Sequence, residues 1–195
     1  MKDINGLTLV ELLISLALLA IISVAGISFF LLPNRVFDNI IVYNALEYDI
    51  NDVKREMAGY VRFASKPDSS TNAIVIYNSD DVIASSGTRI DIYINNGAQF
   101  SKVSYKYHEG SLYRGIVEKA TAEEIITTNV EDYSEVLTGV VYPSDGDLFQ
   151  DVTKDSEKNG RRTILINLIV KDEKGKFTTS ENKPLIVTSR AIVSP

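Results

Sequence analysis

One uncharged, apolar stretch constrains this chain more than any other feature of its sequence. Residues 12–32 read LLISLALLAIISVAGISFFLL, interrupted only by Ser15, Ser23, Gly26 and Ser28. At about 1.5 Å per residue, a helix of this length spans roughly 30 Å, which is the thickness of the hydrocarbon core of a bilayer. The sequence therefore predicts a membrane-spanning helix close to the N-terminus.

Composition and charge exclude several classes of function. A net charge of −6 and a pI near 4.9 argue against a general affinity for nucleic acids or anionic lipid headgroups. The chain has no cysteine, which excludes disulfides, thiolate metal sites and cysteine nucleophiles. Its one histidine, His108, lies in a predicted turn, and no glycine-rich phosphate loop is present. We therefore expect no enzyme activity and no cofactor.

Glu11, at the start of the apolar stretch, has two interpretations. In one, its carboxylate lies at the membrane interface and is solvated by headgroups. In the other it is functional, because a carboxylate drawn toward the bilayer core is costly and needs a cationic partner. A cut between Gly6 and Leu7 would create an amine four residues before Glu11. The amine and carboxylate of neighbouring copies would then attract strongly, since little water screens them.

A signal peptide cleaved after Ala25 and an uncleaved signal anchor are the alternatives for this N-terminus. A secretory signal has a basic segment before its apolar run, whereas here Asp3 and Glu11 outweigh Lys2. These alternatives are therefore the weaker interpretations.

Residues 6–13, GLTLVELL, resemble the type III signal of type IV prepilins and type II secretion pseudopilins, and the long apolar helix of that family follows them. The resemblance implies that a membrane-embedded prepilin peptidase cleaves after Gly6 and N-methylates Leu7. It also implies that Glu11 neutralises the N-terminus of an adjacent subunit during assembly. Two positions depart from the pattern: Leu7 replaces the commoner Phe, and Ser28 stands where major pilins often carry a helix-bending proline.

Beyond Pro33, apolar residues recur at spacings of three and four, which indicates one continuous stripe on a helix that runs to about Lys66. The stripe is Val36, Ile40, Tyr43, Leu46, Ile50, Val53, Met57 and Tyr60 or Val61. The other faces carry charges that we expect to be solvated, among them Asp52, Arg55, Glu56 and Arg62. Pro67 ends the helix.

The remainder is typical of β-strands. Strands are predicted over 73–77, 89–94, 163–170 and 185–193, and a hairpin joins 103–107 to 112–117 through the turn 108–110. We therefore predict an α+β fold of the type IV pilin kind, in which a long N-terminal spindle helix packs on an antiparallel β-sheet head. Its parts are the leader 1–6, the membrane or filament-core half-helix 7–32, the amphipathic half-helix 33–66 and the extracellular head 67–195.

One acidic stretch could bind calcium. Between Glu118 and Glu157 there are eleven acidic residues against two lysines, and Asp145, Asp147 and Asp151 could gather oxygen ligands around this hard cation. The spacing matches no complete loop motif, so a solvated acidic loop is the alternative.

The long head, together with segments 46–64 and 112–114, resembles the J-type minor pseudopilins and the W-type minor pilins. This resemblance implies a low-abundance subunit that joins other minor and major pilins at or near the filament tip and primes assembly. Its other partners would be the prepilin peptidase, the assembly platform and the membrane, the last through residues 7–32, without direct nucleic-acid contact. The subunit would be a single-pass membrane protein with its head outside the cytoplasm, and then part of an extracellular pilus. Two alternatives remain: a pseudopilus subunit for type II secretion or competence, and an uncleaved membrane-anchored surface protein.

Overall fold

The computed structural model describes residues 8–143, 147–154, 161–172, 175, 178–179 and 184–190, without the side chains of residues 25 and 28–36. The chain forms two compact units, residues 1–44 and residues 45–195. We call them the N-terminal unit and the head unit.

One long helix, α1 (Leu9–Phe63), makes up the described part of the N-terminal unit and continues into the head unit. Apolar residues with good helix propensity fill its first half, and Arg62 in its last turn interacts favourably with the carbonyl end of the helix dipole. The predicted long N-terminal helix is confirmed, and it ends at Phe63, three residues before the predicted end near Lys66.

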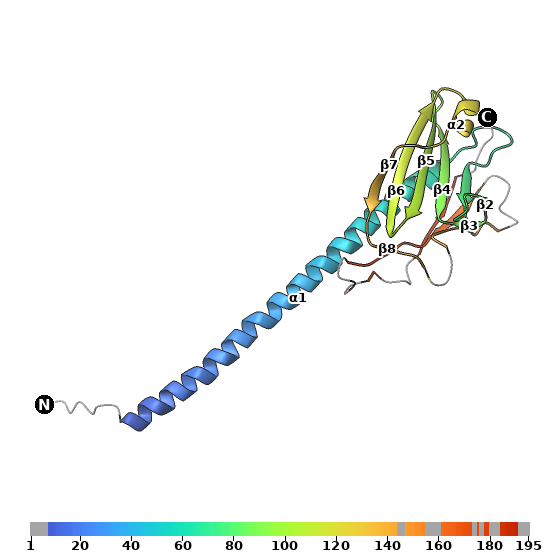
Figure 1. The fold of residues 1–195 in the computed structure, drawn as a ribbon. Coiled ribbons are helices and arrows are strands. Elements are labelled where there is room, and N and C mark those ends of the chain that lie inside the picture. Colours follow the sequence, from blue (N-terminus) through green and yellow to red (C-terminus); the bar gives the residue numbers. More distant parts are fainter. Residues whose placement is uncertain are drawn as a thin grey trace. The chain divides into compact units, whose positions relative to one another are not determined.

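In its described residues, the head unit adds three antiparallel sheets and one short helix (Figure 1). The largest sheet has the order β2 (Ile83–Ala84), β1 (Ile74–Tyr77), β4 (Arg89–Asn95), β5 (Phe100–His108), β6 (Ser111–Lys119), β7 (Tyr133–Leu137). A second has the order β12 (Leu185–Thr188), β10 (Thr163–Ile166), β9 (Phe149–Asp151), β3 (Ser86–Gly87). The third pairs β11 (Ile169–Val170) with β8 (Val140–Val141), and α2 (Ala122–Thr127) lies between β6 and β7 in the chain. The predicted α+β architecture is confirmed.

The β5–β6 hairpin closes as its sequence predicts. His108 pairs with Ser111, which leaves Glu109 and Gly110 as a two-residue turn, with φ of 45° and 83°. Positive φ at both positions is the type I′ geometry that suits the twist of the strands, and glycine adopts it without steric cost. His108 ends β5 instead of lying in the turn, and its side chain is 64% exposed.

The core of the head unit forms where the apolar stripe of α1 meets the inner faces of the two larger sheets. Ile50, Met57 and Val61 are buried against Ile90 and Ile92 of β4, and further buried residues come from the other strands. These include Val103, Tyr105 and Leu112 of the large sheet, and Ile164 and Ile166 of β10. The predicted packing of the helix stripe on a sheet is confirmed for this part of α1. In the N-terminal unit Ile40 is 48% exposed, so the stripe is not buried there.

The single strand predicted for residues 163–170 is wrong. The segment forms β10 and β11, which belong to different sheets. The backbone N–H of Asn167 donates to the carbonyl of Leu148 at 2.8 Å, which extends the β9–β10 register by one pair. From Ile169 onward the chain pairs with β8 instead. All four alternating residues, Ile164, Ile166, Leu168 and Val170, are nevertheless buried. The last strand, predicted over 185–193, is β12, and residues 191–193 lie outside the described part.

Glu56 is not part of the solvated face predicted for α1. Its carboxylate accepts from the Arg114 guanidinium of β6 at 2.5 Å and from the Tyr105 hydroxyl of β5 at 2.8 Å. Burial, followed by the bond to Glu56, raises the pKa of Tyr105 above its usual value, so its hydroxyl stays a donor. Asp52, Arg55 and Arg62 are exposed, as predicted. Glu56 therefore ties α1 to the large sheet.

Met57 is 0% exposed at the centre of the core, and its replacement by alanine tests that packing. We expect Met57→Ala to lower the free energy of unfolding by about 3 kcal/mol, because it removes buried atoms and leaves a cavity. The exposed Arg55→Ala, two residues away, should change it by less than about 0.5 kcal/mol. Thermal or denaturant unfolding of the full chain in detergent measures both, and equal effects would contradict this account of the core.

Candidate functional site

The predicted processing site lies at the edge of the described structure. Gly6 and Leu7 are outside the described residues, whereas Glu11 lies in the first turn of α1. The cleavage at Gly6, the methylation of Leu7 and the assembly role of Glu11 thus stay predictions. The surroundings of Glu11, however, are described.

Thr8 and Glu11 form a capping box at the start of α1. The backbone N–H and the hydroxyl of Thr8 each donate to Oε2 of Glu11 at 2.9 Å, and the backbone N–H of Glu11 is 3.3 Å from the Thr8 hydroxyl oxygen. These bonds satisfy amides at the helix terminus that have no partner within the helix. They also fix the carboxylate of Glu11 beside Thr8, the second residue after the predicted cleavage site.

Two serines of the apolar stretch hydrogen-bond within α1. Ser15 donates to the carbonyl of Glu11, and Ser23 donates to the carbonyl of Leu19, both at 2.7 Å. This bonding pattern, from residue i to i−4, satisfies a hydroxyl without an external partner. The described polar side chains between residues 12 and 24 are therefore compatible with apolar surroundings.

The apolar side chains of the N-terminal unit are exposed. Between Leu9 and Ile27, the exposed fraction of the described large apolar side chains ranges from 52% at Leu12 to 78% at Leu9. The others include Leu13, Ile14, Leu16, Leu18, Leu19, Ile21, Ile22, Val24 and Ile27. So large an exposed apolar surface marks a site that is covered by a membrane or by other protein chains.

Among the described residues, no helix contains an apolar segment long enough to cross a membrane.

Residues 1–27 match a protein-family model described as the prokaryotic N-terminal methylation motif. This motif is the signature of type IV pilins and pseudopilins, and the resemblance seen in residues 6–13 is thereby confirmed. The match supports a membrane-anchored precursor that is cleaved by a prepilin peptidase and assembles with other pilins. The family that carries this motif is one of structural subunits. No curated protein and no solved structure matches the chain.

The calcium candidates are engaged by other side chains where the structure describes them. Asp147 accepts from the hydroxyls of Ser86 and Tyr142. Asp151 forms an ion pair with Arg162 at 2.9 Å, and Asp145 lies outside the described residues. In the described part of the chain, no three His, Asp or Glu side chains are close enough together to hold a metal ion. Calcium binding stays a prediction.

A buried polar cluster joins β4 to β5 in the head unit. Asp91 is 5% exposed and accepts from the Ser104 hydroxyl at 2.6 Å, while Nε of Arg89 lies 3.5 Å from the same carboxylate oxygen. Burial raises the pKa of Asp91 above its ordinary value, and the bond from Ser104 opposes the shift. The guanidinium of Arg89 also stacks on Tyr77 at 3.7 Å. Ser104 thus provides a hydrogen bond to the buried Asp91, and Nη1 of Arg89 donates to Asp81, whereas Nε of Arg89 is buried without a hydrogen-bond partner among the described residues. This arrangement has a structural role, since it ties β4 to β5.

The sequence analysis missed the role of Thr8, although a signal for it was present. A threonine followed three residues later by glutamate, just before an apolar run, is the sequence pattern of a capping box. The pattern is part of the same residues that carry the processing signal. Thr121 and Glu124 have the same spacing. The Thr121 hydroxyl accepts from the backbone N–H of Glu124 and caps helix α2, which the sequence analysis did not predict.

The capping box predicts different effects for two replacements of Thr8. Thr8→Val removes the hydroxyl and should destabilise the first turn by about 1 kcal/mol, whereas Thr8→Ser keeps the bond. Amide exchange at Val10 and Glu11 should therefore be about fivefold faster in the valine variant. Hydrogen exchange on the full chain in detergent micelles measures this, and identical rates in the two variants would rule out the cap.

Proposed function

We propose that this chain is a pilin-like structural subunit of a type IV pilus. In this proposal the prepilin peptidase cleaves after Gly6 and methylates Leu7, and the mature chain enters the filament through α1. The observation that carries the proposal is the coincidence of the methylation motif with a helix whose apolar side chains are exposed from Leu9 to Ile27. A folded head unit on the same chain completes the pattern.

The exposed apolar surface gives the helix two successive environments. Before assembly, residues 7–32 lie in the membrane with the head outside the cytoplasm. After extraction by the assembly platform, the same side chains pack against neighbouring subunits instead of lipid. Both environments exclude water from apolar surface, so the transfer between them costs little hydrophobic free energy.

Glu11 has the geometry to hold the amine of an adjacent subunit. The bonds from Thr8 go to Oε2, and an ionised carboxylate has about four acceptor positions on two oxygens. It can therefore accept from the methylated amine of Leu7 of a neighbour while the cap stays formed. In apolar surroundings such a pair is strong, and either partner left unpaired is penalised.

Within the filament we propose the position of a minor subunit at or near the tip, where it primes assembly. The predicted head of residues 67–195 and the likeness of segments 46–64 and 112–114 to W-type minor pilins support this position. A minor pseudopilin of a secretion or competence system has the same motif and helix, and is the second candidate.

Processing is tested by the intact mass and the N-terminal sequence of the protein recovered from cells that contain a prepilin peptidase. We expect a chain that begins at methylated Leu7, present in purified filaments at a small fraction of the most abundant subunit. A chain that still begins at Met1 would contradict the proposal and leave an uncleaved, membrane-anchored surface protein. Abundance equal to that of the main subunit would contradict the minor position.

Replacement of Glu11 tests its assembly role. Glu11→Ala should lower incorporation into filaments by roughly tenfold or more, because the neighbouring amine loses its partner. Asp38→Ala, which also removes an exposed carboxylate from α1, is the matched control. The unfolding temperature of the head should be the same in both variants, since neither residue belongs to its core. Unchanged incorporation of the Glu11 variant would remove the role.

A further inference from the structure

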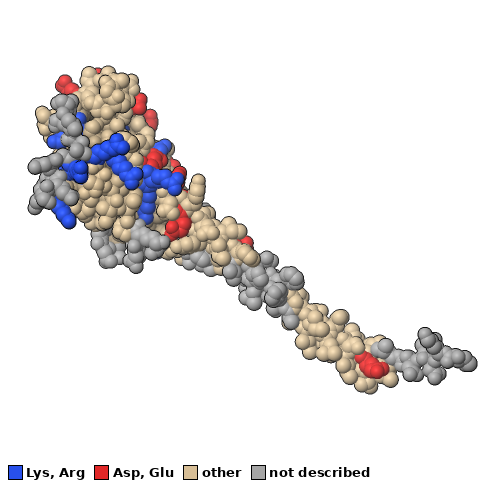
Figure 2. All heavy atoms as spheres, turned by 180° about the vertical axis from the view of Figure 1, so that it is seen from behind, with Lys and Arg blue, Asp and Glu red and all other residues tan. Residues whose placement is uncertain are grey.

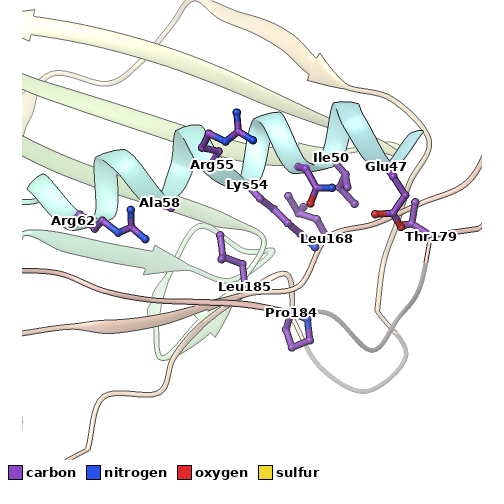
Figure 3. A pocket seen from close by; sticks show the side chains of 11 residues that line it. Glu47, Ile50, Lys54, Arg55, Ala58, Arg62, Leu168, Thr179, Pro184 and Leu185 are labelled. Atoms are coloured by element: carbon purple, nitrogen blue, oxygen red, sulfur yellow. The ribbon is translucent and has the colours of Figure 1, made fainter. Parts of the chain in front are cut away.

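A groove of 450 Å³ runs along one flank of α1 within the head unit (Figure 3). Helix residues 47–62 form one wall, and Leu168, Thr179, Pro184 and Leu185 form the other. Ile50, Ala58 and Leu168 give it an apolar floor. In the close-up, Lys54 extends from the helix toward Leu168, Arg62 lies on the same side of the helix about two turns further on, and Arg55 points away from Leu185 and Pro184. We call this surface the basic flank.

The basic flank concentrates cations in a chain whose net charge is −6. Lys54, Arg55 and Arg62 line the groove against one acidic residue, Glu47. Arg190 lies beside them, since its backbone N–H donates to the carbonyl of Arg62 at 3.2 Å. Arg55, Arg62 and Arg190 are exposed. Seen from behind, the head unit carries a group of Lys and Arg side chains on one face (Figure 2).

The other flank of the same helix segment has the opposite charge. A second groove, of 290 Å³, lies between α1 and the edge strand β7, and its charged lining residues are Asp49, Asp52 and Glu135. Leu46 and Val136 add apolar surface to it. Glu56 lies nearby on α1, but its charge is neutralised by Arg114. We call this surface the acidic flank.

The helical period explains why the basic and acidic side chains lie on different flanks of α1. At about 100° per residue, Lys54 lies about 60° and Arg62 about 140° from the buried Met57 in one direction. Asp49 and Asp52 lie about 80° and 140° from it in the other direction. The flanks therefore face the edges of different sheets, β12 on the basic side and β7 on the acidic side.

The helix dipole does not account for the basic flank. A cation in the last turn, such as Arg62, stabilises the carbonyl end of a helix, but this effect falls off within one turn. Lys54 and Arg55 lie about two turns earlier. In these two grooves one sign dominates, with three cations and Glu47 in the first and three carboxylates in the second. The two signs meet on the side of the helix away from the core, where Asp52 and Arg55 line a further groove together.

We propose that the acidic flank of one copy of this chain packs against the basic flank of the next. The contact joins two different surfaces, so it is heterologous, and a heterologous contact that does not close into a ring propagates as an open filament. The inference rests on the proposed filament role and goes further, since it requires adjacent copies. Low abundance is compatible with this requirement, because two neighbouring copies at the tip suffice.

The charges determine which surface of the neighbouring copy is bound. They contribute less to the free energy of the contact than the burial of apolar surface does. Exposed ion pairs are individually weak, and the screening length is about 8 Å at physiological ionic strength. Apolar residues on both flanks, with Leu185 on one and Leu46 on the other, supply area that is buried without regard to salt. The contact should therefore be specific and sensitive to charge reversal.

Cross-linking in assembled filaments tests the contact directly, because the chain has no cysteine of its own. Asn51 lines the basic flank and Thr138 the acidic flank, and both are uncharged and exposed. The double variant Asn51→Cys/Thr138→Cys, treated with a short bifunctional maleimide, should give copies linked in series. Each single-cysteine variant should give none, since a heterologous contact never brings identical residues together.

Charge reversal then shows that the flanks recognise each other. Arg55→Glu/Arg62→Glu, in the double-cysteine background, should lower cross-linking at least fivefold. Adding Asp49→Lys/Glu135→Lys should restore it, because the signs are then exchanged. Lys119→Glu/Lys154→Glu changes the net charge by the same amount outside both flanks and should leave cross-linking unchanged.

The outcomes separate this inference from the proposed function. A chain that is incorporated into filaments but gives no linked copies overturns the flank contact and leaves the filament role intact. Cross-links from a single-cysteine variant would mean a symmetric contact, and links only to a different pilin would mean another occupant; either result overturns the inference. A chain absent from filaments overturns the proposed function, and the flank contact falls with it.

Discussion

The head unit depends on the burial of one helix stripe between two sheets. Ile50, Met57 and Val61 of α1 cover inward-facing residues of β4 and, from the other sheet, of β10. Buried residues of both sheets and of this helix segment belong to one core. The ion pair between Glu56 and Arg114 also links α1 to β6, beside this core.

The same helix has a different relation to its surroundings in each unit. Within the head unit its apolar residues are buried by the chain itself, whereas in the N-terminal unit the chain leaves residues such as Leu12 and Ile22 exposed. Since apolar surface of this extent is favourable only out of water, the N-terminal unit depends on an environment that the chain does not supply. A methylation motif at the start of such a helix is consistent with assembly into a filament.

The periodicity of apolar residues predicted the elements whose burial follows a regular local pattern. The spacing of Ile50, Val53 and Met57 predicted the buried face of α1, and alternation predicted β4 and the β5–β6 hairpin. The break between β10 and β11 was not predictable in this way, because it depends on a change of partner strand, from β9 and β12 to β8.

Side-chain partners were equally out of reach of the sequence pattern. The helical pattern places Glu56 on the solvated face, and its partner Arg114 becomes evident only from the position of β6 in the fold. Strands of two residues, such as β3 and β8, are too short to show an alternating pattern. The positions of the basic and acidic residues on the two flanks of α1 follow from the helical period. The grooves beside them, however, form between α1 and residues of β12 and β7, which the helix sequence does not predict.

The serines of the apolar helix have a consequence for how helices slide along one another. Aliphatic side chains give nearly the same packing energy at several axial offsets, and hydroxyl groups that bond across helices normally break this degeneracy. Ser15 and Ser23 already donate to their own helix, to Glu11 and Leu19. Their oxygens can still accept a hydrogen bond, but they carry no charge. In the proposed filament, Glu11 is therefore the described side chain between residues 8 and 27 that can form an ion pair with a neighbour's terminal amine. A neighbouring helix could move freely past this surface and stop where its terminal amine reaches that carboxylate, so that one residue sets the axial repeat.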